Sequence, residues 1–457
     1  MKQVPSSLAA LGLALVLTAV PLLAQLNDGK PDPDFAVPGA LDLPYALAFA
    51  LDNNFTIRQA KERIRQQEGV VLEVRSAQIP NVSATGEYQR NDAVVGPTGE
   101  DRYWSFNVTA RQNLYSGGGV SASVKSQQLT LDAAVLTLQA VINDALLDVR
   151  TRFYTVLVSR EKIKVQEQNT ELLRRQLQDV KKRYEAVTVS HFEVLRAEVA
   201  LANAQTPLIT ARNDYRLAIE ELRRSLGFAT ANEGNVTKIP EFIGTLEFVP
   251  ANFDLRTALA TAREQRPDLL RLHRLETAAE EGVTVRRAAY QPNVALFGAY
   301  DWRKGFGSNS LPGNRDGWTV GLSSSWNVFD ARATAGRVAQ ARSLLEQAKL
   351  ASAEAQLSVD VEVRRAVSTF QQSTELAEAS KKVVEQAEEA LRLANARYSA
   401  GTATQLDVLT SQVDLTTARL NQLQAYYSYN VAVATTRKAM GLTDEMRPTK
   451  EVNYPQK

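Results

Sequence analysis

The chain has 457 residues, of which 44% are hydrophobic, and its 53 basic side chains nearly balance 51 acidic ones. The absence of cysteine excludes a disulfide scaffold, a thiolate metal site and a cysteine nucleophile. A net charge of +2 gives no global field for nucleic acid, so we predict no nucleic-acid partner, and length alone predicts about three domains.

Residues 1–24 have the pattern of a secretory signal peptide. Lys2 precedes an uncharged run over 8–24 that ends in the small residue Ala24. The alternative is a membrane anchor, but Pro21 interrupts the run, which is shorter than the about 20 residues that a spanning helix needs. We therefore expect an exported chain in which residues 25–40 form an N-terminal extension.

The remaining sequence is a tandem repeat. Matching residues lie 212 positions apart early in each half and 214 positions apart thereafter. Examples are Gly86/Gly298 and Tyr88/Tyr300 at the first offset, and Asn113/Asn327, Tyr184/Tyr398 and Gly227/Gly441 at the second. We predict a first repeat at 41–227, an inter-repeat segment at 228–251, a second repeat at 252–441 and a tail at 442–457.

Each half contains two predicted strands, at about 81–90 and 103–115 and at about 294–303 and 318–329. Apolar and polar residues alternate along them. All four tryptophans lie in these strands, namely Trp104, Trp302, Trp318 and Trp326. Outer-membrane barrels have such strands, with aromatic girdles at both membrane interfaces, so we assign these tryptophans to the interface. The alternative is a pair of soluble hairpins with tryptophan in the core.

Long helices follow the strands. Residues 120–206, 337–400 and 402–440 contain neither glycine nor proline. A helix of about 70 residues would be about 105 Å long, which indicates an elongated assembly. Steps of three and four predict a packing seam in the last helix, at Leu406, Leu409, Val413, Thr416, Leu420, Leu423 and Tyr427.

Four strands cannot close a barrel, and an open sheet edge cannot face lipid. If the strands span a membrane, several chains must therefore share one barrel. Two copies would supply eight strands, whose side chains nearly fill the interior, whereas three would supply twelve and leave a water-filled lumen. The sequence thus predicts an oligomeric pore, most simply a trimer.

Several motifs have the same order in both halves. They are QIPNVSATGEY and YQPNVALFGAY before the strands, NLYSGGG and WNVFDAR after them, ARYSAGTATQLDVL at 396–409 and KAMGL at 438–442. In this order they resemble the TolC-type outer-membrane efflux proteins over about residues 41–442. The sequence departs from the family pattern at two points. In the first half, Val187 stands at the position that Gly401 occupies in the second half, which predicts a differently built turn. In the second half, Asp330-Ala331-Arg332 replaces the Asp-Gly-Gly of the family.

The resemblance implies a mainly helical fold with a membrane β-barrel portion. A homotrimer would form a twelve-stranded β-barrel in the outer membrane of a Gram-negative-type bacterium and a twelve-helix α-barrel in the periplasm. Residues 228–251 and 442–457 would supply an equatorial region. Members are passive exit ducts that work with a periplasmic adaptor and an inner-membrane transporter of the RND, ABC or MFS type. They carry drugs, metals, small molecules or polypeptides, and the duct uses no cofactor and performs no chemistry.

The resemblance also places Asp407 in a carboxylate ring at the periplasmic pore entrance, and the repeat places Glu193 in the equivalent position. Thr410 and Arg196 would lie beside them. Six carboxylates near one axis would favour cations and raise their own pKa values by like-charge repulsion. The alternative is that both are ordinary solvated helix charges, or that Arg196 pairs with Glu193.

Tyr398 and Tyr184 match family positions whose contacts hold the entrance closed, and Gly401 forms the adjoining turn. Packing at a heptad seam is the alternative for both tyrosines. His191 and His273 have no ligand-spaced neighbours, so we predict no metal site. The rival classes are a periplasmic adaptor and a secreted coiled-coil structural protein, and an enzyme is the least favoured because no convergent polar constellation occurs.

Overall fold

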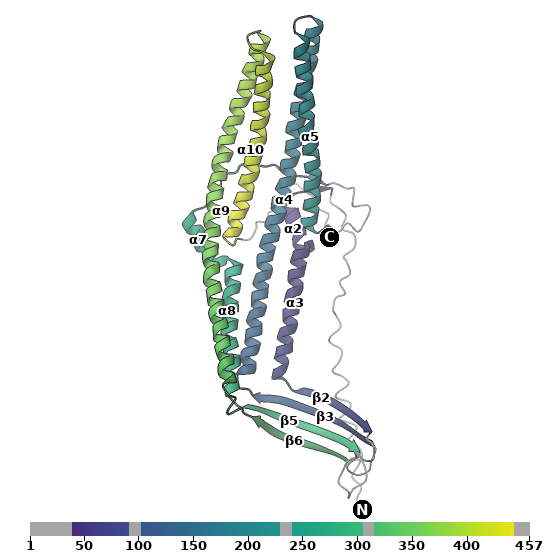
Figure 1. Ribbon diagram of the computed structural model, residues 1–457, viewed down its shortest axis with the longest axis vertical. Coiled ribbons are helices and arrows are strands. Elements are labelled where there is room, and N and C mark those ends of the chain that lie inside the picture. Colours follow the sequence, from purple (N-terminus) through teal and green to yellow (C-terminus); the bar gives the residue numbers. More distant parts are fainter. Residues whose placement is uncertain (1–38, 91–101, 229–239, 305–314, 443–457) are drawn as a thin grey trace, which may run out of the picture. The chain divides into compact units, whose positions relative to one another are not determined.

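The computed structural model describes residues 39–90, 102–228, 240–304, 315–442 (Figure 1). Outside these ranges lie the predicted signal peptide and almost all of the N-terminal extension and the C-terminal tail. The segments 91–101 and 305–314, which connect the two predicted strands of each half, also lie outside them. Leu41–Phe228 and Phe242–Lys457 form one compact unit, which contains every long helix and the large sheet among the described residues. A short ladder pairs β1 (Ala40–Leu41) with β4 (Glu241–Phe242).

The helices follow the same order in both halves, so the chain is mainly helical and duplicated. The first half has α2 (Leu43–Asn53), α3 (Phe55–Arg75), α4 (Gly119–Glu185) and α5 (His191–Leu226), with the 3-10 turn η1 (Ser76–Gln78) after α3. The second half has α7 (Leu255–Gln265), α8 (Pro267–Arg287), α9 (Ala333–Ser399) and α10 (Gln405–Ala439), with η2 (Ala288–Tyr290) after α8. Helices α4 and α9 have 67 residues each, which gives a length of about 100 Å at 1.5 Å per residue.

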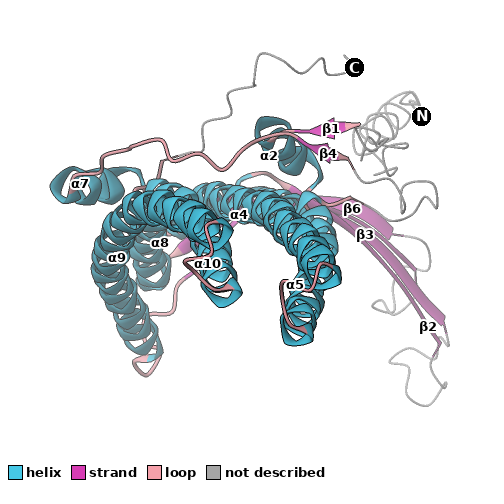
Figure 2. Cartoon of the chain, turned by 90° about the horizontal axis from the view of Figure 1, so that it is seen from above, coloured by secondary structure: helices cyan, strands magenta, loops and turns pink. Residues whose placement is uncertain are grey.

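Helix α4 contacts α2, α3, α5, α8 and α10, and α9 contacts α7, α8 and α10. The layer of helices near the sheet consists of α3, α4, α8 and α9, and the layer toward the helix-hairpin turns consists of α5, α4, α10 and α9 (Figure 1). Figure 2 shows α9, α10, α4 and α5 from above. Of the described helices, α4 alone contains a stretch long and apolar enough to cross a membrane. The neighbouring helices cover part of α4 within the unit, and 22% of its apolar stretch is buried.

The seam between α9 and α10 differs from the predicted one. A cluster of Val384, Leu391, Val408, Leu415 and Ala418 is buried between these helices. Two members of the predicted seam, Leu406 and Val413, are instead 51% and 63% exposed. Helix α10 carries two neighbouring apolar stripes, and spacing alone does not reveal which one faces its own hairpin partner. Farther along the predicted seam, Leu423 and Tyr427 pack against a buried cluster that includes Leu146 and Phe153 of α4.

Four antiparallel strands form one sheet in the order β2-β3-β5-β6. They are β2 (Asn81–Arg90), β3 (Arg102–Tyr115), β5 (Asn293–Lys304) and β6 (Arg315–Ser325). The prediction of a strand at 318–329 is wrong at both ends. Strand β6 stops at Ser325 because that residue lies opposite Asn293, the first residue of β5, so the next four residues have no strand to pair with.

The sheet has one apolar and one mostly polar face, because successive side chains of a strand point to opposite sides. The registers place on the apolar face Val82, Tyr88, Trp104, Phe106, Val108, Leu296, Tyr300, Trp302, Trp318, Val320 and Leu322. They place on the other face Ser83, Thr85, Glu87, Ser105, Asn107, Thr109, Arg111, Asp301, Arg303, Thr319 and Ser323. Many of the apolar side chains are exposed on this chain, so the face lacks a cover within it.

Within the described ranges, three non-glycine residues have a left-handed backbone, with φ of 59° at Val187, 51° at Ala331 and 72° at Arg332. Their repeat counterparts are the left-handed glycines Gly401, Gly117 and Gly118. The repeat therefore keeps the same turn geometry where the glycine has been lost. Asp330 stabilises its turn by accepting a hydrogen bond from the Thr334 amide at 2.7 Å.

Candidate functional site

The two helix hairpins end in turns of the same construction. The amide of Gly401 donates to the Tyr398 carbonyl at 3.1 Å, and the amide of Val187 donates to the Tyr184 carbonyl at 2.9 Å. The expectation of a differently built first turn is thus wrong. Val187 adopts the left-handed conformation that Gly401 adopts, because the surrounding hydrogen bonds fix the turn.

Replacing Val187 with glycine should stabilise the first turn. A left-handed conformation costs an L-residue about 1–2 kcal/mol, while added glycine entropy in the unfolded chain returns about 0.4–1 kcal/mol. The side chain is 89% exposed, so no packing is lost. We expect a net gain of about 0.5–1 kcal/mol, measured as increased hydrogen-exchange protection at 183–190. The converse change, Gly401→Val, should lower protection at 397–404, and equal signs for the two variants would contradict this explanation.

Asp407 forms a capping box at the start of α10. Its Oδ2 atom accepts hydrogen bonds from the Thr404 amide at 2.7 Å and from the Thr404 hydroxyl at 2.8 Å. The Asp407 amide in turn donates to the Thr404 hydroxyl oxygen at 3.3 Å. The carboxylate is therefore fixed at the turn rather than swinging freely.

Glu193 occupies the equivalent position at the start of α5, where the cap residue Ser190 makes no side-chain cap bond. One carboxylate oxygen of Glu193 is buried without a hydrogen-bond partner among the described residues, and the other lies 4.0 Å from Arg196 Nη1. The Arg196 guanidinium stacks over the Phe192 ring, 4.8 Å from its centre. Arg196 thus pairs only weakly with Glu193. Thr410 is exposed on the next turn of α10.

Bonds from the Thr404 amide and hydroxyl hold the pKa of Asp407 below its ordinary value. This shift arises within one chain, and the rise by like-charge repulsion in a ring of several copies stays a prediction. A depressed folded-state pKa means that the stabilisation is complete above the ordinary carboxyl pKa and is lost as the pH falls through the folded-state value. We expect hydrogen-exchange protection factors at 405–408 to stay constant from about pH 8 to pH 5 and to fall below about pH 4.

The Asp407→Asn variant should show low protection at 405–408 over the whole pH range. The start of α5, which has no side-chain cap bond, is the internal control. An unchanged profile in Asp407→Asn would exclude the capping role.

A contact between the two hairpins involves Tyr398. The Arg183 guanidinium of α4 lies over the Tyr398 ring of α9, 4.9 Å from its centre. Tyr398 also packs on the α9–α10 cluster. Its counterpart Tyr184 is 44% exposed and meets His191 of its own hairpin edge-on at 5.6 Å. The tyrosines therefore differ, and sequence reasoning missed the role of Arg183 because no spacing rule relates it to the other hairpin.

Polar side chains also join α4 to α10. Gln412 donates to the Asn169 side chain at 2.9 Å, and Arg419 donates to Gln168 of α4 at 3.3 Å and to Glu388 of its own hairpin partner α9 at 2.8 Å. Two grooves beside this contact have volumes of about 580 and 530 Å³. Apolar side chains join the two helix hairpins as well, because Tyr426 and Tyr427 of α10 pack against the buried cluster around Phe153 of α4.

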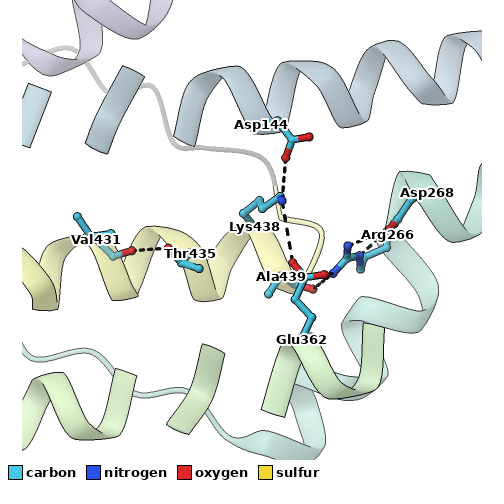
Figure 3. A network of polar contacts seen from close by, with 8 residues as sticks. All are labelled: Asp144, Arg266, Asp268, Glu362, Val431, Thr435, Lys438 and Ala439. Atoms are coloured by element: carbon cyan, nitrogen blue, oxygen red, sulfur yellow. Dashed lines mark hydrogen bonds and ion pairs between the residues drawn. The ribbon is translucent and has the colours of Figure 1, made fainter. Parts of the chain in front are cut away.

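A charged joint lies where α7 meets α8 (Figure 3). Arg266 is buried and donates to both carboxylate oxygens of Asp268, at 3.0 and 2.8 Å. It also donates to Glu362 of α9 at 2.7 Å and to the Ala439 carbonyl at the end of α10 at 3.3 Å. Lys438 continues the network to Asp144 of α4 at 2.7 Å. Burial raises the pKa of Asp268, but the Arg266 bonds and charge outweigh it and leave the pKa lowered.

The first half builds the same joint without charge. Asn54 is the repeat counterpart of Arg266 and donates to the carbonyl of Ser225, the counterpart of Ala439, at 2.7 Å. Its side-chain oxygen also caps α3 by accepting from the Thr56 and Ile57 amides. The α4–α5 hairpin is therefore joined to the α2–α3 junction through a neutral contact, and the α9–α10 hairpin is joined to the α7–α8 junction through an ionic one.

The tryptophans lie near both ends of the sheet. The registers and strand directions place Trp104, Trp302 and Trp318 near the end of the sheet where β2 leads to β3 and β5 leads to β6. Trp326 lies at the opposite end, beside the helices, where its indole nitrogen donates to the Tyr290 carbonyl at 3.1 Å. Trp318 and Trp326 are 75% and 56% exposed.

Comparisons with known proteins agree with this architecture. The family model described as "Outer membrane efflux protein" matches residues 47–228 and 258–442. The chain is 26% identical over 381 residues to Protein CyaE of Bordetella pertussis, covering 83% of this chain and 79% of the relative. It is 25% identical over 425 residues to the cobalt-zinc-cadmium resistance protein CzcC of Cupriavidus metallidurans, covering 88% and 90%.

Solved structures share the fold at low sequence identity. The crystal structure of the Campylobacter jejuni CmeC outer membrane channel superposes with a TM-score of 0.74 and 16% identity, over 87% of this chain and 85% of that one. The family model covers most of the chain in two matches of similar length, one in each half. The chain belongs to the outer membrane efflux protein family, and it is an outer-membrane exit duct of an export system that projects into the periplasm.

Proposed function

We propose that three copies of this chain close a twelve-stranded barrel in the outer membrane and a twelve-helix tunnel beneath it. The observation that carries this proposal is a four-stranded sheet with one apolar face, one polar face and two free edges. A sheet cannot face lipid with an open edge, so each edge needs another copy. Four helices lie side by side in each helical layer, and three copies supply twelve.

The aromatic residues support the position of the sheet in the membrane. Trp318 and Trp326 are eight residues apart, which is about 27 Å along a strand at about 3.4 Å per residue. Barrel strands tilt by about 35–45°, so this corresponds to a band about 21 Å tall, near the about 25 Å typical of outer-membrane barrels. Trp104 and Trp302 join Trp318 in the outer girdle, and Trp326 lies in the inner one.

We further propose that the hairpin turns form the periplasmic entrance. Asp407 and Glu193 would supply its carboxylates, with Thr410 and Arg196 beside them. The contact between Arg183 and Tyr398 joins neighbouring hairpins at this end and would hold the entrance closed. Tyr184 and Gly401 would complete the packing and the turn of the gate.

The duct would receive its cargo from an inner-membrane transporter through a periplasmic adaptor, and the duct itself would perform no chemistry. The names of relatives include alkaline protease secretion, pyoverdine export and cobalt-zinc-cadmium resistance. These names range from a protease to metal ions, so membership of the family does not by itself define the class of cargo. Membership of this family excludes the two rival classes, a periplasmic adaptor and a secreted coiled-coil structural protein.

Membrane fractionation followed by light scattering of the detergent-solubilised protein tests the proposal. We expect the chain in the outer membrane, with a protein mass of three copies of the mature form of this 50.3 kDa chain. A soluble monomer, or an assembly of another copy number, would refute the trimer.

A further inference from the structure

The contact between β3 and β5 is the internal template for a contact between copies. It joins the β2–β3 hairpin of the chain to the β5–β6 hairpin, with Arg111 opposite Phe297. In a closed ring of copies, the corresponding contact joins β6 of one copy to β2 of the next. Its register can be derived from the repeat, because β6 is the counterpart of β3 and β2 is the counterpart of β5.

The derivation requires that the two hairpins match residue for residue. Within the first hairpin Asn81 lies opposite Arg111, and within the second Asn293 lies opposite Ser325. Moving the first pair by 212 and 214 residues gives the second pair. The offsets read from the sequence are therefore also the structural offsets of the strands.

We propose that β6 of one copy pairs with β2 of the next in the register that places Ser323 opposite Glu87 and Leu322 opposite Tyr88. This inference rests on the trimer proposed above and fixes how its copies join. Applying the two offsets to the β3–β5 register also places Ser325 opposite Thr85 and Trp326 opposite Ala84.

The alternation of side chains supports this register independently. Leu322 and Tyr88 both lie on the apolar face of their own strands, and Ser323 and Glu87 both lie on the polar face. The proposed pairing makes both faces continuous across the junction. A slip by one residue would turn the polar side of one strand toward lipid.

The register also provides partners for the segment that follows β6. Strand β3 has a bulge between Asn113 and Tyr115, after which Tyr115 lies opposite Val294. The counterpart of this pair is Phe329 opposite Val82 of the next copy. Residues 326–329 would thus continue β6 in the assembly, although they have no partner strand in one chain.

Side chains at the helix-side end of the proposed β6–β2 contact match each other in polarity as well. Within the chain, the Tyr115 hydroxyl lies 3.1 Å from Gln291 Oε1 and donates to it. The counterparts are Phe329 and Ile79, which are 87% and 62% exposed on one copy. A polar pair inside the chain is thereby replaced by an apolar pair between copies.

This junction must be wider than the internal one. A Cβ atom on Gly117 would lie 2.6 Å from Gln291 Cβ, and one on Gly119 would lie 2.8 Å from Ala288 Cβ. The counterparts of these glycines are Ala331 and Ala333, which carry such atoms. The copies therefore cannot approach as closely at these positions as the two halves do.

Cysteine cross-linking tests the register, and the natural chain has no cysteine to interfere. Directly opposed residues have Cβ atoms about 4.5–5.5 Å apart and diagonal ones about 7–8 Å, whereas a disulfide needs about 3.5–4.5 Å. In isolated outer membranes, Ser323→Cys with Glu87→Cys should oxidise to covalent trimers at least tenfold faster than Ser323→Cys with Thr85→Cys or Gln89→Cys. Leu322→Cys with Tyr88→Cys repeats the measurement on the apolar face.

Light scattering of each variant separates the register from the trimer. Faster linkage in the Thr85 or Gln89 variant, in a particle of three copies, would overturn the register while leaving the trimer intact. Absence of linkage in both opposed pairs within such a particle would also overturn the register. A monomeric particle would refute the trimer itself.

Discussion

Replacing Tyr398 with alanine should increase the fraction of time that the purified duct conducts in a planar bilayer. The variant loses the Arg183 guanidinium stack between the two hairpins. Such a contact contributes about 0.5–1 kcal/mol at exposed sites, and three copies contribute about 1.5–3 kcal/mol. Because about 1.4 kcal/mol is a factor of ten, we expect a roughly 10- to 100-fold shift from closed to open.

Three variants separate the contact from simple packing. Tyr398→Phe keeps the ring and should behave as the natural chain, whereas Arg183→Ala should open the duct as much as Tyr398→Ala. Tyr184→Ala is the matched control, since the Tyr184 ring meets His191 of its own hairpin. Equal opening by Tyr184→Ala, or none by Arg183→Ala, would refute the role of the Arg183–Tyr398 contact.

Replacing Arg266 with alanine should loosen the joint between α8, α9 and α10. It removes a buried cation that binds Asp268, Glu362 and the Ala439 carbonyl. Breaking a buried ion pair costs about 3–5 kcal/mol, but both carboxylates reach solvent, so we expect about 2–3 kcal/mol. Hydrogen-exchange protection at 266–270 and 437–442 should then fall roughly 30- to 150-fold.

Arg263→Ala is the matched control for this experiment. Arg263 makes a similar two-bond contact with Asp360, at 3.1 and 2.6 Å, but it is 51% exposed. Exposed ion pairs contribute about 0–1 kcal/mol, so protection should fall less than about fivefold. If the two variants lower protection equally, burial of Arg266 does not explain the stability of the joint.

The long helices were predictable because local signals define them. Glycine and proline are absent over 120–206 and 337–400, and α4 and α9 lie inside or close to these ranges. The repeat also reveals the duplicated order. The packing seam of α10 was not predictable from spacing. The stripe that contains Leu406 and the stripe that contains Leu415 both repeat every seven residues, and only the positions of the neighbouring helices decide which stripe is buried against α9.

The turns show a different limit of sequence reasoning. Loss of glycine at Val187 predicts a changed turn, yet the backbone stays left-handed because its hydrogen bonds are those of the Gly401 turn. The capping role of Asp407 is readable from Thr404, three residues earlier. The Arg266 network and the Arg183–Tyr398 contact join residues far apart in sequence, and no local pattern records them.

The third limit concerns β6, whose predicted end at 329 lies four residues beyond its end in a single chain. Alternation continues through Trp326 and Val328, so the local pattern is that of a strand. Strand pairing is a property of two strands, and the proposed partner of this segment belongs to another copy.

Electron microscopy of the detergent-solubilised assembly tests the central claim most directly. Projections along the helices should show threefold symmetry around one water-filled lumen, with twelve helices in the wall. A projection with twofold symmetry, or with three separate chains that enclose no common lumen, would contradict the account.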